Sequence, residues 1–195
     1  MLMNENTKEE IINIIETNKK LLTELQEGSL ETIAAAAELI VKSLKEGGRV
    51  YICGNGGSAA DAQHIASEFV GRFERERKGL PAVALTTDTS LITSISNDYG
   101  YENIFAKQVE ALVNKGDILW AISTSGSSEN VVLAAELAKK KDAYVLAFTG
   151  KAGSKLEKIA DVCLCTKSDS TARSQEIHQL GFHIICGLVE KAFCE

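Results

Sequence analysis

The chain of 195 residues has a single proline, and it lacks internal repeats and low-complexity stretches. That proline, Pro81, stands at the start of an apolar run, so it does not mark a linker. We therefore expect one domain, residues 1–195, with enough chain to bury a substantial core. With 45% hydrophobic and 25% charged residues, the composition excludes intrinsic disorder.

Excess positive charge is absent as well, because the formal net charge is −6. Proteins that bind duplex nucleic acid rely on a basic surface, so this charge argues against a nucleic-acid partner. No apolar run approaches about 18 residues, and no charged-then-apolar leader is present. We expect a cytoplasmic protein with no membrane partner. The five cysteines include no C-x-x-C pair and are expected to stay reduced.

Nucleotide-binding glycine motifs of the Walker and dinucleotide types are also missing. The sequence has instead two loops of glycine and hydroxyl residues, 54–58 and 123–128, each between an apolar run and a helical pattern. Backbone N–H groups at such a turn point to one spot, at the positive end of the helix dipole. The two loops together predict a phosphate site, although each alone is compatible with an ordinary tight turn.

From residue 48 onward, short apolar runs alternate with helical spacing. This alternation predicts an α/β fold, a three-layer αβα sandwich around a five-stranded parallel sheet, with ligands beyond the carboxyl ends of the strands. The charged stretch 72–78 is expected to be a solvated connection. The expected strands are 49–53, 82–86, 117–122, 143–148 and 161–165, and the expected helices are 58–70, 89–97, 103–113, 128–140, 153–159 and 171–193.

Two further helices are expected before the alternation, at 7–26, with Thr7 as its N-cap, and at 30–45. Both carry an apolar stripe beyond what a five-stranded sheet needs to cover its faces. The segment 1–47 is therefore a candidate for self-association. The alternative is that both helices fold back onto the sheet.

Histidine is rare, and its three occurrences have different contexts. His64 precedes Glu68 by four residues, so they share a helix face as a candidate metal or acid–base pair, although surface pairs often have this spacing. The apolar neighbours of His183 are typical of a buried histidine. Gln175 lies about 12 Å before His183 along a helix, so the two would reach one ion only by leaning together or across a subunit boundary. We expect His178 to be structural or to support the site indirectly.

Asn97 and Asp98 lie between the two loops in sequence, just before Gly100. Short polar side chains before a glycine are typical of the end of a helix. The alternative is that they form hydrogen bonds to sugar hydroxyls.

These stretches together resemble the sugar isomerase (SIS) family and, within it, the phosphoheptose isomerases. The serine–threonine–serine–glycine loop alone indicates only a phosphosugar-binding SIS fold, whereas the addition of His64, Glu68, Gln175 and His183 is more specific. The sequence departs from the family at Ser174, where an apolar residue is expected. The matching stretches are 53–58, 61–68, 97–100, 122–130 and 175–178, with His183.

The resemblance implies a flavodoxin-like SIS fold with oligomerisation helices at 1–47 and a phosphosugar-binding core at 48–195. It implies an isomerase that converts sedoheptulose 7-phosphate to D-glycero-D-manno-heptose 7-phosphate through an enediol. That reaction would be the first step of nucleotide-activated heptose biosynthesis, for glycans such as lipopolysaccharide. It further implies a homotetramer with its sites at subunit contacts.

The resemblance also implies the residues of the site. Glu68 and His183 are the implied catalytic residues, and the implied cofactor is one zinc ion per subunit. The implied zinc ligands are His64, Glu68, Gln175 and His183. The implied substrate-binding residues are Asn55, Gly56, Gly57, Glu68, Asn97, Asp98, Ser123, Thr124, Ser125, Ser128 and Gln175.

Two alternative functions remain. One is another SIS-fold isomerase, acting on a hexose phosphate or amino-sugar phosphate. The other is a non-catalytic relative that binds a replication-initiator protein. The four implied zinc ligands argue against the first alternative. That all four are present in the sequence argues against the second.

Overall fold

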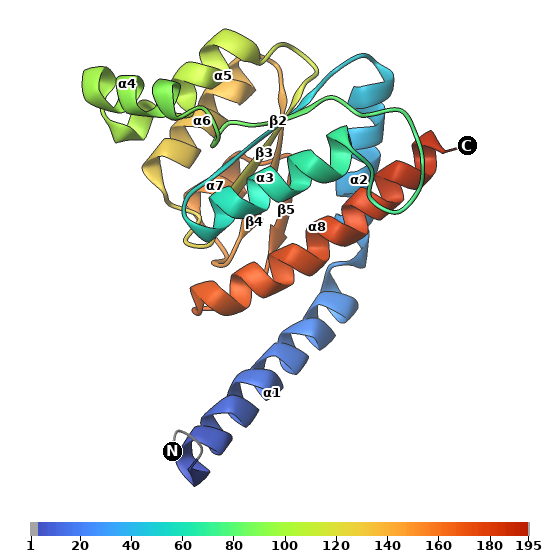
Figure 1. Cartoon of the computed structure of the whole chain (residues 1–195), viewed down its shortest axis with the longest axis vertical. Coiled ribbons are helices and arrows are strands. Elements are labelled where there is room, and N and C mark those ends of the chain that lie inside the picture. Colours follow the sequence, from blue (N-terminus) through green and yellow to red (C-terminus); the bar gives the residue numbers. More distant parts are fainter. Residues whose placement is uncertain (1–3, 195) are drawn as a thin grey trace.

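The structure, a computed structural model, describes residues 4–194 and has three layers built around a parallel β-sheet (Figure 1). The strands pair in the order β2-β1-β3-β4-β5, and every neighbouring pair is parallel. This order is that of flavodoxin-like folds, so the predicted fold class is confirmed. The strands are β1 (Val50–Gly54), β2 (Ala82–Ala84), β3 (Ile118–Ser123), β4 (Tyr144–Thr149) and β5 (Val162–Cys165).

The helices follow the predicted alternation closely. The predicted helices 30–45 and 171–193 match the observed bounds, whereas 103–113 is shortened because a 3₁₀ turn precedes it. In the part of the chain that the structure describes, no helix has the length and apolar character needed to cross a membrane. The helices are α1 (Glu5–Gly28), α2 (Leu30–Lys45), α3 (Gly57–Val70), α4 (Thr89–Tyr99), η1 (Tyr101–Asn103), α5 (Ala106–Leu112), α6 (Glu129–Lys140), α7 (Lys155–Ile159) and α8 (Thr171–Phe193).

Each face of the sheet has its own hydrophobic core, because successive strand residues point to opposite faces. Ile52, Trp120 and Phe148 belong to one core, which α2, α3 and α8 cover. Tyr51 and Leu119 belong to the other, which is covered mainly by α5, α6 and α7. The burial of both faces explains why the strands read as continuous apolar runs.

The two leading helices differ in how they pack. α2 buries Ile33 and Ile40 and contacts α8 and β5, so it folds back onto the sheet as the alternative expected. α1 buries Leu21 and Leu25 near its end, and its first half projects away from the body (Figure 1). Only α1 thus remains a helix in excess of what the sheet requires.

The predicted N-cap of α1 is wrong. The helix begins three residues earlier than a Thr7 cap would allow, and Asn4 is its cap. The Asn4 side-chain oxygen accepts a hydrogen bond from the Thr7 backbone N–H at 2.8 Å. An asparagine caps at least as well as a threonine, so the earlier residue sets the start of the helix.

The prediction of a solvated connection at 72–78 holds for Arg72, Glu74, Arg75, Glu76 and Lys78, which are exposed, but it is wrong at Arg77. The side chain of Arg77 is only 3% exposed and pairs with Glu190 of α8. Because Arg77 and Glu190 are far apart in the sequence, the sequence alone did not reveal this pair.

Ser174, the departure from the family pattern, is buried as well, and its hydroxyl accepts a hydrogen bond from Thr166 at 3.0 Å.

Candidate active site

The two glycine and hydroxyl loops lie next to each other, because they follow the adjacent parallel strands β1 and β3. Together with the start of α8 they line a cavity of about 260 Å³. This is the edge of the sheet where α/β folds bind ligands. The lining residues are Asn55, Gly56, Gly57, Ser58, Ile122, Ser123, Thr124, Ser128, Thr171 and Gln175.

Hydroxyl groups of the second loop gather where Ser123, Thr124 and Ser128 line this cavity. The Ser123 hydroxyl oxygen lies 2.9 Å from that of Ser128 and 3.3 Å from that of Ser125. The Ser125 hydroxyl in turn accepts a hydrogen bond from the Ser127 backbone N–H. With the N-termini of α3 and α6 beside them, these donors suit an anion with several oxygens.

Gly57, the first residue of α3, allows α8 to approach closely. A Cβ atom at this position would lie 2.4 Å from the amide nitrogen of Gln175. The Gln175 amide therefore lies directly against the start of α3, at the cavity that the two loops line.

A pair of asparagines supports the first loop, and sequence reasoning missed the second of them. The side chains of Asn55 and Asn130 exchange two hydrogen bonds, both of 2.9 Å, and the Tyr101 hydroxyl lies 3.0 Å from the Asn55 side-chain oxygen. Asn130 is buried at the start of α6. The sequence signal that could have identified Asn130 is its position two residues after the second loop.

Asn97 and Asp98 are not among the residues that line the cavity. Both belong to the last turn of α4, are exposed and form a hydrogen bond of 2.7 Å to each other. Gly100, with a φ of +87°, ends the helix as the sequence indicated.

His64, Glu68 and His183 come together between α3 and α8. The Nε2 atom of His64 lies 3.0 Å from a carboxylate oxygen of Glu68, and the rings of His64 and His183 are 5.0 Å apart. The His183 ring also contacts Phe182 at 4.6 Å and Phe73 at 5.6 Å. A carboxylate and two imidazoles in contact can accept, hold and donate protons.

The surroundings favour neutral His183. Burial lowers the pKa of this imidazole, a positive charge on His64 lowers it further, and Glu68 acts in the opposite direction. One turn before His64, burial raises the pKa of the Asp61 carboxyl to about 6, and one of its oxygens is buried without a hydrogen-bond partner. Sequence reasoning did not single out Asp61, although it lies in a stretch that matches the family.

The structure brings together three of the four predicted metal ligands and leaves Gln175 apart. α8 is continuous between Gln175 and His183, which places them about 12 Å apart along its axis. Within residues 4–194, no group of three or more histidine, cysteine, aspartate or glutamate residues is arranged to hold a metal ion. The predicted set is therefore split between two places in one chain.

His178 does not belong to the cluster. Its side chain is fully buried, and Nε2 lies 3.1 Å from the carbonyl oxygen of Thr149 at the end of β4. Burial lowers the pKa of this imidazole to about 4, against the opposing effect of that hydrogen bond. His178 thus links α8 to the sheet as a neutral side chain.

Comparison with known proteins defines first the class and then the family. The SIS domain model matches residues 15–150, so the chain is an SIS-domain protein. A phosphoheptose isomerase of Roseiflexus sp. (strain RS-1) is 50% identical over 185 residues, which cover 95% of this chain and 94% of the relative. One of Helicobacter pylori (strain P12) is 49% identical over 178 residues, 91% of each chain.

Solved structures agree. Phosphoheptose isomerase of Neisseria gonorrhoeae has a TM-score of 0.89 and 42% identity, covering 94% of this chain and 98% of its own. That of Francisella tularensis has a TM-score of 0.92 and 40% identity, covering 97% and 100%. The chain belongs to the phosphoheptose isomerase family and is an aldose–ketose isomerase.

Proposed function

We propose that this enzyme converts sedoheptulose 7-phosphate to D-glycero-D-manno-heptose 7-phosphate. The observation that carries the proposal is the contact of His64, Glu68 and His183, in a chain that also has a phosphate-sized cavity lined by loop amides and hydroxyls. The names of the relatives support the choice of a heptose phosphate.

The cavity is proposed to bind the phosphate group. Ser123, Thr124, Ser125 and Ser128 would donate hydroxyl or backbone hydrogen bonds to it, with no lysine needed. The proposed contacts to the sugar come from Asn55, Gly56, Gly57, Asn97, Asp98, Glu68 and Gln175.

Glu68 and His183 are proposed to transfer the protons. The isomerisation removes one proton from C1 of the ketose and delivers one to C2, through an enediol. A carboxylate and an imidazole that contact the same C1–C2 unit supply a base and an acid for these transfers. The lowered pKa of His183 leaves it neutral, a form that can accept a proton.

The chemistry of the cluster fits a zinc cofactor, one ion per subunit. Imidazole nitrogens and a carboxylate are typical zinc ligands, and His64, Glu68 and His183 offer both kinds, with Gln175 as the fourth proposed ligand. When bound, zinc would polarise the sugar carbonyl and stabilise the negative charge that develops on its oxygen.

We propose that each active site is completed by two copies of the chain. One chain alone holds Gln175 in the phosphate cavity and His183 about 12 Å away along α8. A neighbouring copy would bring its Gln175 and phosphate cavity to the His64–Glu68–His183 cluster. The proposed assembly is a homotetramer in the cytoplasm, with residues 1–47 contributing to association and 48–195 binding the phosphosugar, and it would begin nucleotide-activated heptose biosynthesis for glycans such as lipopolysaccharide.

The test is turnover of sedoheptulose 7-phosphate by protein of known metal content. Glu68→Gln and His183→Gln keep side-chain volume and should each lower kcat by about 10²- to 10⁴-fold, the usual effect of losing one proton transfer. Removal of zinc by a strong chelator should abolish turnover, and added zinc should restore it.

The matched control is Glu136→Gln, the same change at an exposed position of α6. It should leave turnover unchanged. A near-wild-type rate in Glu68→Gln or His183→Gln would contradict the role of that residue. Full activity in metal-free protein would contradict the role of zinc, and no turnover of the heptose phosphate would contradict the proposed substrate.

A further inference from the structure

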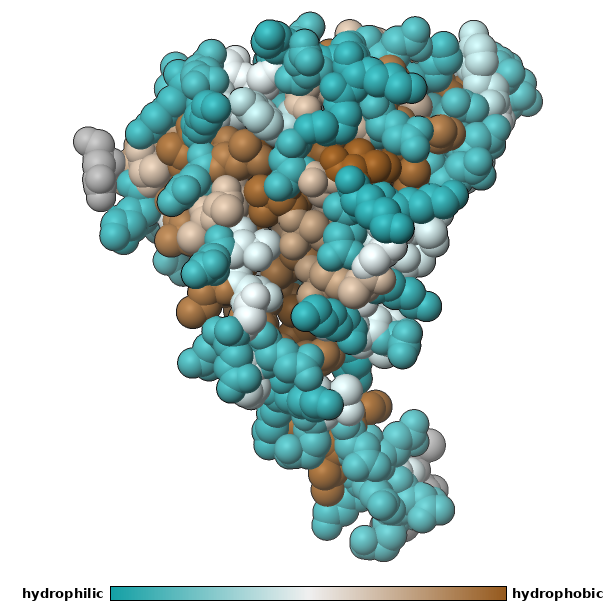
Figure 2. All heavy atoms as spheres, turned by 180° about the vertical axis from the view of Figure 1, so that it is seen from behind, coloured by the Kyte–Doolittle hydropathy of each residue, from teal (hydrophilic) through white to brown (hydrophobic). Residues whose placement is uncertain are grey.

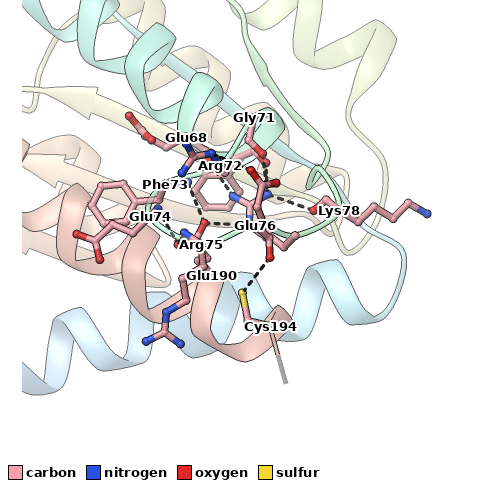
Figure 3. Close-up of polar contacts among 12 residues, drawn as sticks. Glu68, Gly71, Arg72, Phe73, Glu74, Arg75, Glu76, Lys78, Glu190 and Cys194 are labelled. Atoms are coloured by element: carbon pink, nitrogen blue, oxygen red, sulfur yellow. Dashed lines mark hydrogen bonds and ion pairs between the residues drawn. The ribbon is translucent and has the colours of Figure 1, made fainter.

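The loop that joins α3 to β2, residues 71–81, is rich in charged residues, yet a buried ion pair holds it in place. Nε of Arg77 lies 3.3 Å from a carboxylate oxygen of Glu190, and the two side chains are 3% and 2% exposed. Figure 3 shows Glu190 reaching from α8 into this loop. Buried ion pairs stabilise a fold little more than apolar residues of the same size would, so this one invites another explanation.

Glu190 fixes the backbone of the loop. Its carboxylate accepts hydrogen bonds from the backbone N–H groups of Phe73, Glu74 and Arg75, at 2.8, 2.8 and 2.9 Å (Figure 3). Burial alone would raise the pKa of Glu190, but these three bonds and the charge of Arg77 outweigh it and lower the pKa. The side chain is therefore an anion that holds three consecutive residues in place.

Arg77 fixes the end of α3. Its guanidinium donates hydrogen bonds to the carbonyl oxygens of Glu68, Phe69 and Gly71, at 2.6, 2.8 and 3.2 Å. A cation at the C-terminus of a helix satisfies its last carbonyls and complements its dipole. The helix end that Arg77 holds is the turn that carries Glu68.

The same loop places an aromatic ring on His183. The Phe73 ring lies 5.6 Å from the His183 ring, tilted by 30°. The ring also lies beside Gly187, where an added Cβ atom would stand 3.4 Å from it, at ordinary van der Waals distance. Phe182 and His64 contact the same imidazole at 4.6 and 5.0 Å. The orientation of His183 thus depends on where the loop holds Phe73.

We propose that Arg77 and Glu190 are positioning residues for the proton-transfer cluster. Glu190 acts on His183 through Phe73, and Arg77 acts on Glu68 through the end of α3. The inference rests on the proposed function only for its effect on turnover, because the contacts that orient His183 exist whatever the substrate is.

The first experiment compares Phe73→Leu and Glu190→Gln with Arg72→Met. Arg72 lies in the same loop and forms an exposed pair with Glu76, away from the cluster, so its loss serves as the matched control. Phe73→Leu and Glu190→Gln should lower kcat by about 10- to 100-fold, the cost of slight misplacement of reacting groups, with little change in KM. Phe73→Tyr, which keeps the ring, should restore most of the rate.

The second measurement follows the imidazole C–H resonances of His183 by NMR in metal-free protein. The chain has three histidines, and His183→Gln identifies the signals. Phe73→Leu and Glu190→Gln should shift them, and Arg72→Met should not. Zinc affinity, measured by competition with a chromophoric chelator, should fall in the same two variants.

Loss of stability with unchanged His183 resonances and unchanged kcat per folded molecule would overturn the proposal, because it would show a purely structural pair. If Glu190→Gln does not fold, Phe73→Leu decides by the same criteria. If the wild type does not turn over sedoheptulose 7-phosphate while the resonances still shift, the positioning role stands and the proposed function fails.

Discussion

At the scale of single residues, His178 and His183 show how position decides the chemistry of a side chain. They lie five residues apart on α8, yet His178 faces the sheet and is fully buried, whereas His183 faces α3 and is partly exposed. In the only polar contact of His178 within the described chain, Nε2 meets the Thr149 carbonyl, and its Nδ1 has no partner. A second proton on His178 would therefore be buried with nothing to accept it.

This burial predicts a pH-dependent stability. The pKa of His178 is about 4 in the folded chain and about 6.5 when unfolded, so between these values the unfolded chain binds the extra proton. The free energy of unfolding should fall by about 2 kcal/mol as pH falls from 7 to 5. Glutamine does not titrate, so His178→Gln should lose this part of the pH dependence of stability. It should also lower turnover less than His183→Gln does.

Denaturant unfolding of the wild type and of His178→Gln at pH 7 and pH 5, with chelator present, measures how the free energy of unfolding depends on pH in each protein. Other groups titrate equally in the two proteins, so the difference between the two pH dependences is due to His178. Equal slopes would show that the folded imidazole binds a proton as readily as the unfolded one.

At the scale of elements, the contact between α3 and α8 builds both parts of the site. The two helices meet near their starts at Gly57 and Gln175, and about two turns later they meet again at His64 and His183. One helix pair thus supports both the cavity between the two loops and the His64–Glu68–His183 cluster, the proposed phosphate and proton-transfer sites.

The close contact at Gly57 predicts the effect of Gly57→Ala. The added methyl group would lie 2.4 to 2.9 Å from the Gln175 amide, and this flexible group would have to move out of the cavity. We expect a small change in stability, a higher KM for the sugar phosphate and weaker zinc binding. Steady-state kinetics and thermal unfolding test this against Gly28→Ala, where a Cβ atom meets nothing within 4 Å. An unchanged KM would place Gln175 outside the substrate site.

At the scale of the whole molecule, packing within one chain does not explain the exposed apolar surface of α1. Its first half carries exposed Ile11, Ile12, Ile14 and Ile15, each 43 to 48% exposed. Figure 2, from behind, shows apolar atoms on this projecting limb as well as over the body. An isolated helix with this surface gains little from folding alone, so a second copy that covers it would explain its presence.

The double substitution Ile11→Glu with Ile15→Glu should therefore break assembly and lower turnover and zinc affinity together. Lys20→Glu changes the net charge by the same −2 and lies on α1, where its side chain is 78% exposed, so it is the matched control. Light scattering and sedimentation measure assembly beside activity. A double variant that remains an oligomer, or a monomer with full activity, would contradict the proposal that two copies complete the site.

Much of the fold was predictable because its signals are local. Apolar runs and helical spacing predicted the alternation, and the bounds of α2 and α8 matched, since α2 ends shortly before Gly47 and α8 begins after the capping side chain of Ser170. Both loops were found for the same reason, as short stretches with a composition of their own. The contact of His64 with Glu68 follows from a four-residue helical spacing.

Contacts between distant residues were decided only by the tertiary structure. Arg77 and Glu190 are 113 positions apart, and nothing in the composition of 72–78 distinguishes a buried pair from solvated charges. The same holds for Asn130 against Asn55 and for the packing of α2 on the sheet beside a projecting α1. The sequence determined which elements form and which residues carry chemistry, because helices, turns and caps depend on neighbours in the chain. Only the folded chain decided which charges are buried and which residues of the candidate site meet, because burial depends on how whole elements pack.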